Sequence, residues 1–174
     1  MPETASNLLE NKFPGFFQKF GSEVQNVVLM REDLMVHLRP EKIREVIHFL
    51  KTESLPRFEI MMDLFAMDYL KFEPEQPERF AVIYNLYSLT GNIHLHLKVF
   101  LNEDKPEIDS ICEVYKAANW FEREAWDLFG IQFKGHPNLT RILCHNEFVG
   151  HPLRKDYPAD RFQRLKAAVT SEGI

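Results

Sequence analysis

Apolar and polar residues alternate with a period of two in several stretches of the chain, which is the pattern of half-buried β-strands. Four stretches read in this way, residues 34–38, 58–64, 80–86 and 93–99, and residues 24–30 read as a further strand before them. Thr90-Gly91-Asn92 stands between the last two of the four and predicts a tight turn, so these two strands should form an antiparallel hairpin with one wet face.

Three other stretches have the spacing of helices. Apolar residues recur at Leu9, Phe13, Phe16, Phe17 and Phe20, and Pro14 places the start of a short helix near itself. Pro40 opens a second helix, and a third spans about 110 to 129. The order helix, two strands, helix, three strands, helix predicts an α+β fold of two layers with a mixed sheet.

Regular patterning stops after Gly130, which suggests two parts: an α+β domain over 1–129 and an extended tail over 130–174. The tail keeps apolar residues although it has no sustained period, so it should lie along its own domain or along another protein. Gly135-His136-Pro137 is echoed by Gly150-His151-Pro152, which suggests that one local bend is used twice.

Charge is unevenly spread over the 174 residues, whose formal net charge is −5. The segment 134–174 has seven Lys and Arg against four Asp and Glu, and the rest has fourteen against twenty-two. An acidic body with a basic tail argues against general nucleic-acid binding and favours a protein partner for the tail. No apolar run approaches the roughly 20 residues of a spanning helix, so any membrane contact should be indirect.

Few residues suit redox or nucleophilic chemistry. The two cysteines, Cys112 and Cys144, are too few to hold an iron–sulfur cluster or structural zinc by themselves, and a reducing cytoplasm suits them. The seven glycines form no phosphate-binding or dinucleotide-binding loop.

The segment Glu122-Arg123-Glu124-Ala125-Trp126-Asp127 offers the strongest candidate for acid–base chemistry. Glu124 and Asp127 are i,i+3 neighbours on a helix and could form a catalytic pair. An ion-pair network around Arg123 is favoured instead, because a nearby cation keeps both carboxylates ionised. Glu122 falls near the apolar face, and burial there calls for a cation, which the tail could supply.

The histidines leave two alternatives open. His94 and His96 share one strand face, which is a two-histidine metal half-site or, preferably, part of a polar outer face. His136 and His151 could be ligands or bases, but as turn residues they would hydrogen-bond local backbone. A small stand-alone metal-dependent enzyme that uses Glu124, Asp127 and these histidines is therefore the rival to a non-catalytic protein.

Four stretches of the second half resemble one family closely. They are 122–131, Gly135-His136-Pro137, Arg141-Ile142-Leu143 and 150–158, the last reading GHPLRKDYP. Together they resemble the C subunit of bacterial NADH–quinone oxidoreductase, the 30 kDa subunit family of respiratory complex I. The related subunits of membrane-bound hydrogenases and photosynthetic NDH complexes are alternatives.

The resemblance implies a subunit of the peripheral arm, on the cytoplasmic side of the bacterial inner membrane, without a cofactor or metal of its own. FMN and the iron–sulfur clusters would lie in partner subunits. The chain would pack against the D subunit, which helps to form the quinone site, and near the B and I subunits. The residues that it implies for subunit interfaces are Glu122, Arg123, Glu124, Asp127, His136, Arg141, His151, Arg154, Lys155, Asp156 and Tyr157.

Overall fold

A five-stranded sheet forms the centre of the computed structural model, which describes residues 7, 11–31, 33–161 and 163. Its strands are β1 (Val24–Met30), β2 (Asp33–Leu38), β3 (Ile60–Asp68), β4 (Phe80–Ser88) and β5 (Ile93–Leu101). They lie in the order β1-β2-β5-β4-β3, and only β2 and β5 run parallel. The predicted α+β class, the mixed sheet and the β4–β5 hairpin are confirmed.

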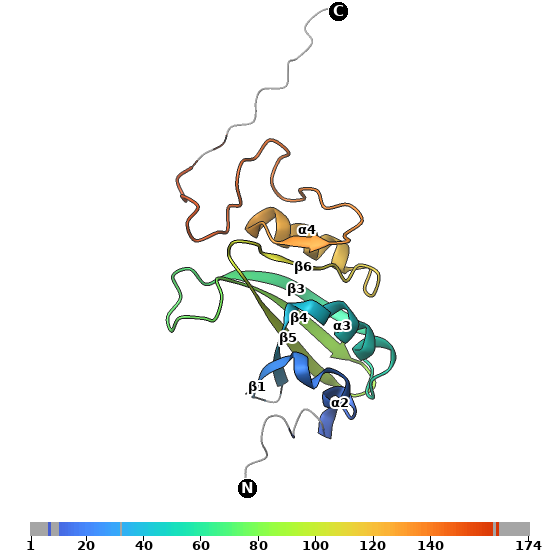
Figure 1. The fold of residues 1–174 in the computed structure, drawn as a ribbon. Helices are drawn as coiled ribbons and strands as arrows, with labels where there is room; N and C mark the ends of the chain where they lie inside the picture. The colour runs from blue at the N-terminus through green and yellow to red at the C-terminus, as the bar shows by residue number, and fades with distance from the viewer. Residues whose placement is uncertain (1–6, 8–10, 32, 162, 164–174) are drawn as a thin grey trace, which may run out of the picture.

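Short helices cover one face of this sheet (Figure 1). They are α2 (Phe16–Phe20), the 3₁₀ turns η1 (Gly21–Glu23) and η2 (Pro40–Lys42), α3 (Ile43–Thr52) and α4 (Ala118–Phe129). Pro40 opens a helical segment as predicted, but as a 3₁₀ turn that runs into α3. The predicted first helix begins after Pro14, while Leu9 lies outside the described residues.

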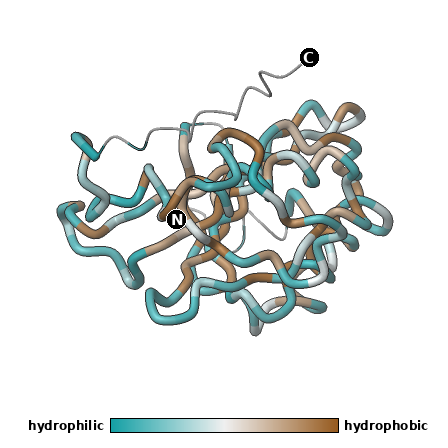
Figure 2. The backbone as a smooth tube through the Cα atoms, turned by 90° about the horizontal axis from the view of Figure 1, so that it is seen from above, coloured by the Kyte–Doolittle hydropathy of each residue, from teal (hydrophilic) through white to brown (hydrophobic). Residues whose placement is uncertain are grey.

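The main core lies between these helices and the sheet. Alternate strand residues such as Val36, Tyr84 and Leu97 are fully buried there against Ile47 of α3. Figure 2 shows the same division: hydrophobic residues are concentrated toward the middle of the molecule, and hydrophilic residues lie mostly at its periphery. The opposite sheet face has a smaller apolar cluster, so the predicted wet face of the hairpin is only partly polar.

The alternation predicted for β3 is wrong in its first half. Ile60 and Met62 are 39% and 53% exposed, whereas Met61 and Leu64 are buried. The pairing of β3 with β4 shifts between Met61 and Asp63. Such a bulge inserts one residue and moves the following side chains to the other face.

Helix α4 begins at Ala118, not near residue 110 as predicted. The residues before it form two short turns: the N–H groups of Val114 and Tyr115 bond to the carbonyl of Ile111, and that of Ala118 bonds to the carbonyl of Tyr115. Ser110 is held elsewhere, because its N–H donates to the carbonyl of Lys134. The apolar stripe extends through these turns, so its period alone did not mark the start of the helix.

Two three-residue strands were not predicted. β6 (Glu107–Asp109) precedes α4 in the sequence and β7 (Gln132–Lys134) follows it. The two strands pair in parallel, which makes a small β-α-β unit. Strands this short carry too little alternation to be detected in sequence. Strand β7 contacts α4, which packs mainly against β3.

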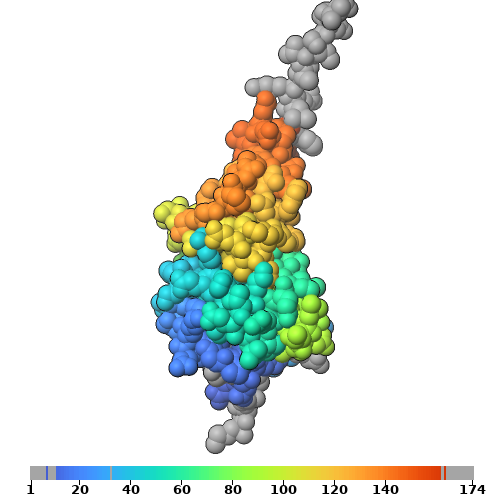
Figure 3. Space-filling view, turned by 90° about the vertical axis from the view of Figure 1, so that its right-hand side faces the viewer, coloured from blue at the N-terminus to red at the C-terminus, as the bar shows by residue number. Residues whose placement is uncertain are grey.

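After Lys134 the chain forms no helix or strand in its described part and runs over α4 as an extended tail. Residues 139–161 form one end of the molecule and α2 lies at the other (Figures 1 and 3). Of the tail's basic residues, Arg164 and Lys166 lie outside the described residues. Among the helices that the structure does describe, none combines the length and the apolar character needed to cross a bilayer.

Candidate interface around helix α4

Asp127, near the end of α4, fastens the tail to the domain. Its side chain is fully buried, and Oδ2 accepts the N–H groups of Ile142, Leu143 and Cys144 at 2.8–3.0 Å. Oδ1 binds the guanidinium of Arg141. Burial alone would raise the pKa of Asp127, but these donors outweigh it and lower the pKa to about 2. The carboxylate is therefore ionised and saturated with donors.

Arg141 extends this anchor along the tail. Its Nη2 donates to the carbonyls of Phe148 at 2.7 Å and Gly150 at 3.1 Å. The guanidinium also lies 5.6 Å from the ring centres of both Trp126 and Phe148. Because the Arg141 side chain bonds to both carbonyls and to Asp127, it holds the irregular loop between Arg141 and Gly150 against α4.

The prediction that Arg123 is the centre of an ion-pair network on α4 is wrong. Arg123 donates to the carbonyls of Thr140 and Arg141, both at 3.0 Å, and its guanidinium lies 5.4 Å from the ring centre of Trp120. The ion pair of Asp127 is made by Arg141 instead. Arg123 thus binds the backbone of the tail and does not organise the carboxylates of its own helix.

The two Gly-His-Pro turns bind opposite ends of α4. Gly135 and Gly150 both have positive φ, at 80° and 98°, so the echoed bend predicted from sequence is confirmed. The ring of His136 donates to the carbonyl of Asn119 at 3.1 Å, and that of His151 to the carbonyl of Asp127 at 3.0 Å. Both histidines bond backbone, as predicted: His151 bonds that of α4, and His136 bonds both α4 and its own turn, where Nδ1 accepts the N–H of Asn138.

Gly130 ends α4 in a left-handed conformation, with φ +78°. A Cβ there would lie 2.5 Å from Nη2 of Arg154 and 2.7 Å from the ring of His151. Arg154 also donates from Nε to the carbonyl of Phe129 at 2.6 Å. The end of the helix and the tail therefore meet at a point where only glycine fits.

We expect Gly130→Ala to loosen the tail and to destabilise the chain by more than the ~1–2 kcal/mol of left-handed strain. Gly15→Ala is the matched control, because Gly15 has φ +82° and no atom within 4 Å of an added Cβ. The measurements are the free energy of unfolding and the rate of trypsin cleavage after Arg154 and Lys155. Equal effects of the two substitutions on both measurements would contradict the close packing at Gly130.

The tail is also bonded to the sheet, at the ends of β3 and β4. The N–H of Lys155 donates to buried Asp68 at 2.8 Å, and Arg79 lies 2.9 Å from Asp68 and 2.8 Å from Asp156. Burial would raise the pKa of Asp68, but Arg79 and two backbone N–H groups outweigh it and lower the pKa. Neither Asp68 nor Arg79 was singled out in the sequence, because only the folded tail brings them next to Asp156.

The other predicted interface residues have lesser roles within the chain. Tyr157 stacks on Phe148 with ring centres 5.9 Å apart. Glu124 is exposed and lines a cavity of about 160 Å³ together with Leu128 and Leu153. The structure brings the predicted set together around α4, but a role in binding another subunit stays a prediction.

Glu122 is fully buried, and its predicted cation is absent from the described residues. The N–H of Ile111 donates to Oε1 at 2.7 Å, and the thiol of Cys112 donates to Oε2 at 3.3 Å. Burial raises the pKa of Glu122, and the hydrogen bonds from Ser110, Ile111 and Cys112 offset only part of that effect. The prediction of a cation is wrong because backbone and thiol donors satisfy the carboxyl.

Cys112, Glu122 and His136 place three potential ligand atoms within 4.8 Å of one another, which makes them a candidate metal cluster. Both ring nitrogens of His136 are already engaged, because Nδ1 accepts the N–H of Asn138 at 3.0 Å and Nε2 faces the carbonyl of Asn119. Burial also raises the pKa of the Cys112 thiol to about 11. A metal needs a free imidazole lone pair and a thiolate, so the cluster does not fit one.

Glu122 gives a prediction on pH. Its folded pKa is raised, so its contribution to stability is complete below the ordinary value of 4.5 and is lost as pH rises above that value. We expect Glu122→Gln to gain stability relative to the unsubstituted chain as pH increases from about 4.5 to 7. Melting temperatures across this range, with Glu124→Gln as the control on the same helix, test this. A constant difference between the two chains would contradict it.

The histidines of β5 lie apart from α4. His94 stacks on Tyr87, with ring centres 4.6 Å apart. His96 bonds Asn85 through Nδ1, and its Nε2 lies 3.9 Å from Asp33. Burial lowers the pKa of His96, so the ring is neutral at pH 7.

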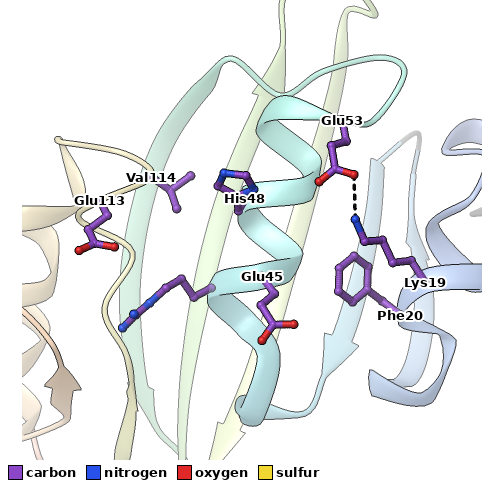
Figure 4. A pocket seen from close by; sticks show the side chains of 8 residues that line it. Lys19, Phe20, Glu45, His48, Glu53, Glu113 and Val114 are labelled. Atoms are coloured by element: carbon purple, nitrogen blue, oxygen red, sulfur yellow. Dashed lines mark hydrogen bonds and ion pairs between the residues drawn. The ribbon is translucent and has the colours of Figure 1, made fainter.

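A groove of about 520 Å³ lies between α2, α3 and the turn before α4 (Figure 4). Lys19 reaches across it to Glu53 at 2.8 Å, and Arg44 bonds to the carbonyl of Ser110 at 3.0 Å. His48 lines its wall on α3. The groove contains none of the predicted site residues.

The model of one protein family, described as the 30 kDa subunit of respiratory-chain NADH dehydrogenase, matches residues 36–163. This range includes the sheet from the second half of β2 onward, α4 and the described part of the tail. The chain belongs to this family.

Curated relatives agree with this membership. The C subunit of NADH-quinone oxidoreductase from Geotalea uraniireducens is 44% identical over 81% of this chain and 82% of its own length. The same subunit from Salinispora arenicola is 38% identical over 90% of this chain but only 61% of its own length. A mitochondrial relative, the probable NADH-ubiquinone oxidoreductase 30.4 kDa subunit of Candida maltosa, is 38% identical over 82% of this chain and 50% of its own length.

Two solved structures share the fold. A trypsin-resistant fragment (1-134) of Nqo5 is 30% identical, with a TM-score of 0.63, and covers 77% of this chain and 98% of its own. A chain of the membrane-bound sulfane sulfur reductase, an archaeal respiratory membrane complex, has a TM-score of 0.70 at 23% identity over 94% of this chain and 98% of its own. The second likeness shows the fold alone.

Proposed function

We propose that this chain is a cofactor-free structural subunit in the peripheral arm of a proton-translocating NADH–quinone oxidoreductase. It positions the D subunit, which helps to form the quinone site, and the cluster-bearing B and I subunits. FMN and the iron–sulfur clusters belong to those partners and other subunits. The chain lies on the cytoplasmic side of the bacterial cell membrane and meets the membrane only through the complex.

The tail carries this proposal. Its backbone is fastened to α4 by Asp127 and Arg141, yet it leaves large apolar side chains exposed. Leu143 and Val149 are each 62% exposed, and Leu153 is 48% exposed. A rigidly held segment with exposed apolar side chains is a docking surface that loses little conformational entropy on binding.

The carboxylates of α4 support a structural role over catalysis. Asp127 accepts four donors and has no lone pair directed at a substrate. Glu122 is enclosed and held toward its neutral form by burial. Of the pair Glu124 and Asp127 that a stand-alone enzyme would use, Asp127 is thus committed to holding the tail, and Glu124 is exposed on the surface of α4.

The names of the relatives favour the respiratory enzyme over a hydrogenase or a photosynthetic NDH complex. The proteins from Geotalea and Salinispora are both named as the C subunit of NADH-quinone oxidoreductase. The trypsin-resistant fragment of Nqo5 is similar to most of this chain, which supports a compact, protease-resistant body.

Co-purification tests the proposal. The tagged chain, purified from its host, should bring the D subunit in a one-to-one ratio together with the B and I subunits. Leu143→Asp should reduce this yield about tenfold or more, because a charge on a buried contact site is strongly disfavoured. Leu89→Asp is the control, since Leu89 is 59% exposed in the β4–β5 turn, away from the tail. Equal recovery of the D subunit with both variants would contradict docking through the tail.

The proposal that the chain binds no cofactor is tested by a separate measurement. The chain expressed alone should be colourless and should contain neither flavin nor stoichiometric iron or zinc. One equivalent of metal that is lost in His136→Gln or in His94→Gln would overturn this part of the proposal.

A further inference from the structure

Lys98 is buried on the sheet face that the helices leave uncovered. The residue is 8% exposed and pairs with His37 on β2 and Ile83 on β4. The apolar side chains of this face are those of the small cluster: Met67, Tyr69, Ala81, Ile83 and Phe100. A lysine in such a setting normally keeps its ammonium in water or next to a carboxylate.

No carboxylate pairs with Lys98 in the part of the chain that the structure describes. Its Nζ lies 4.4 Å from the ring centre of Phe100 and 4.7 Å from that of Tyr69. The carboxylate of Asp33, on the neighbouring strand β2, lies against His96 at 3.9 Å. Two aromatic rings hold the ammonium in place, and its Nζ stays accessible to water.

Beside Lys98 this face carries the ring of His37, which packs edge-on against Phe100 with ring centres 5.6 Å apart, and around them lies an apolar, partly exposed rim. Phe65, which pairs with Ile83, is 38% exposed on the edge strand β3. Phe72 is 49% exposed and packs edge-on against Tyr69, with ring centres 5.2 Å apart. One fixed cation within an apolar rim is complementary to an apolar surface that carries one carboxylate.

We propose that Lys98 receives the carboxylate of an Asp or Glu from a neighbouring subunit, whose apolar side chains cover Phe65 and Phe72. This inference rests on the chain being a subunit of a complex, and it adds a second contact surface besides the tail. Helix α4 packs on the opposite, core side of the sheet, and the tail meets the sheet at the ends of β3 and β4, where Lys155 and Asp156 bond to Asp68 and Arg79.

Zero-length carbodiimide cross-linking of the intact complex, read by mass spectrometry, tests the pairing. This reagent joins an amine to a carboxylate only when the two are in contact, so Lys98 should be linked to an Asp or Glu of another subunit. Lys105 is the internal control, because it is exposed and its Nζ lies 3.0 Å from Glu107 of the same chain. A Lys98 link to a second copy of this chain, or a Lys105 link to Glu107 without any Lys98 link, would overturn the proposal.

Lys98→Met separates docking from folding. The substitution keeps the length of the side chain and removes its charge, so the isolated chain should keep its melting temperature. Dissociation of the chain from the complex should become about 30-fold faster or more, which is typical when one partner of a buried charge pair is removed. A lower melting temperature with unchanged dissociation would show a role within this fold alone. The complex would still assemble in that case, so the proposed function would stand while this inference failed.

Discussion

Deletion of this chain from its host is expected to abolish NADH-dependent quinone reduction by the membrane fraction. The flavin module should still pass electrons from NADH to an artificial acceptor such as ferricyanide. Electron tunnelling needs cofactors at fixed separations, and a missing scaffold disturbs those separations without removing a catalytic group. The two activities are measured on the same membranes, and reintroduction of the chain should restore the first.

Single substitutions distinguish scaffolding from chemistry in this experiment. His94→Gln, His96→Gln, His136→Gln and His151→Gln should each leave turnover intact wherever the complex assembles. His136 and His151 bond the carbonyls of α4, so their replacement should affect stability and assembly first. A variant that assembled with all clusters and subunits but lost quinone reduction would require a direct chemical role and would refute the scaffold proposal.

The strands were the most predictable part of the fold. The range 24–30 coincides with β1, and the Thr90-Gly91-Asn92 turn joins β4 to β5 as predicted. Alternation is a local signal that survives in the sequence where one face of a strand is buried, as in β2. The prediction from alternation failed at Met62, because a bulge shifts the register of β3 there. Nothing in the local composition marks the inserted residue.

The start of α4 shows a different limit. The apolar stripe from Ile111 to Ala118 has helical spacing, but β6 and β7 draw Ser110 and Lys134 together and Glu122 captures the N–H of Ile111. These contacts join residues far apart in sequence. Long-range pairing therefore overrode a local helical preference that the sequence alone displays.

The structure brings the predicted interface residues together, but the contacts between them could not be read from the sequence. The motif residues from Glu122 to Tyr157 do gather around α4, yet Arg123 was given the role that Arg141 has. Spacing on a helix predicts which residues are i,i+4 neighbours. It cannot predict that an arginine from an irregular tail, such as Arg141, folds back onto the helix. Asp68 and Arg79 escaped notice for the same reason, since Lys155 and Asp156 reach them only after the tail folds back.

Asp127→Asn is expected to destabilise the chain by about 3–5 kcal/mol at pH 7, as the loss of a buried charge partner does. The substitution leaves the guanidinium of Arg141 without its anion and turns an amide N–H₂ toward existing donors. Residues 141–150 should then detach from α4, because Arg141 also holds the carbonyls of Phe148 and Gly150. Urea unfolding and trypsin cleavage after Arg141 measure the two effects.

The pH dependence makes this prediction specific to the carboxylate. The folded pKa of Asp127 is about 2, below its ordinary value of 3.8, so its stabilisation is complete above 3.8 and is lost as pH falls toward 2. The difference in unfolding free energy between Asp127→Asn and the unsubstituted chain should therefore narrow over that interval. Glu124→Gln, three residues earlier on the same helix, should change the unfolding free energy by less than about 1 kcal/mol. If Asp127→Asn unfolded like Glu124→Gln at pH 7, the tail would have to be held by its apolar contacts, and Asp127 would lose its place as the anchor.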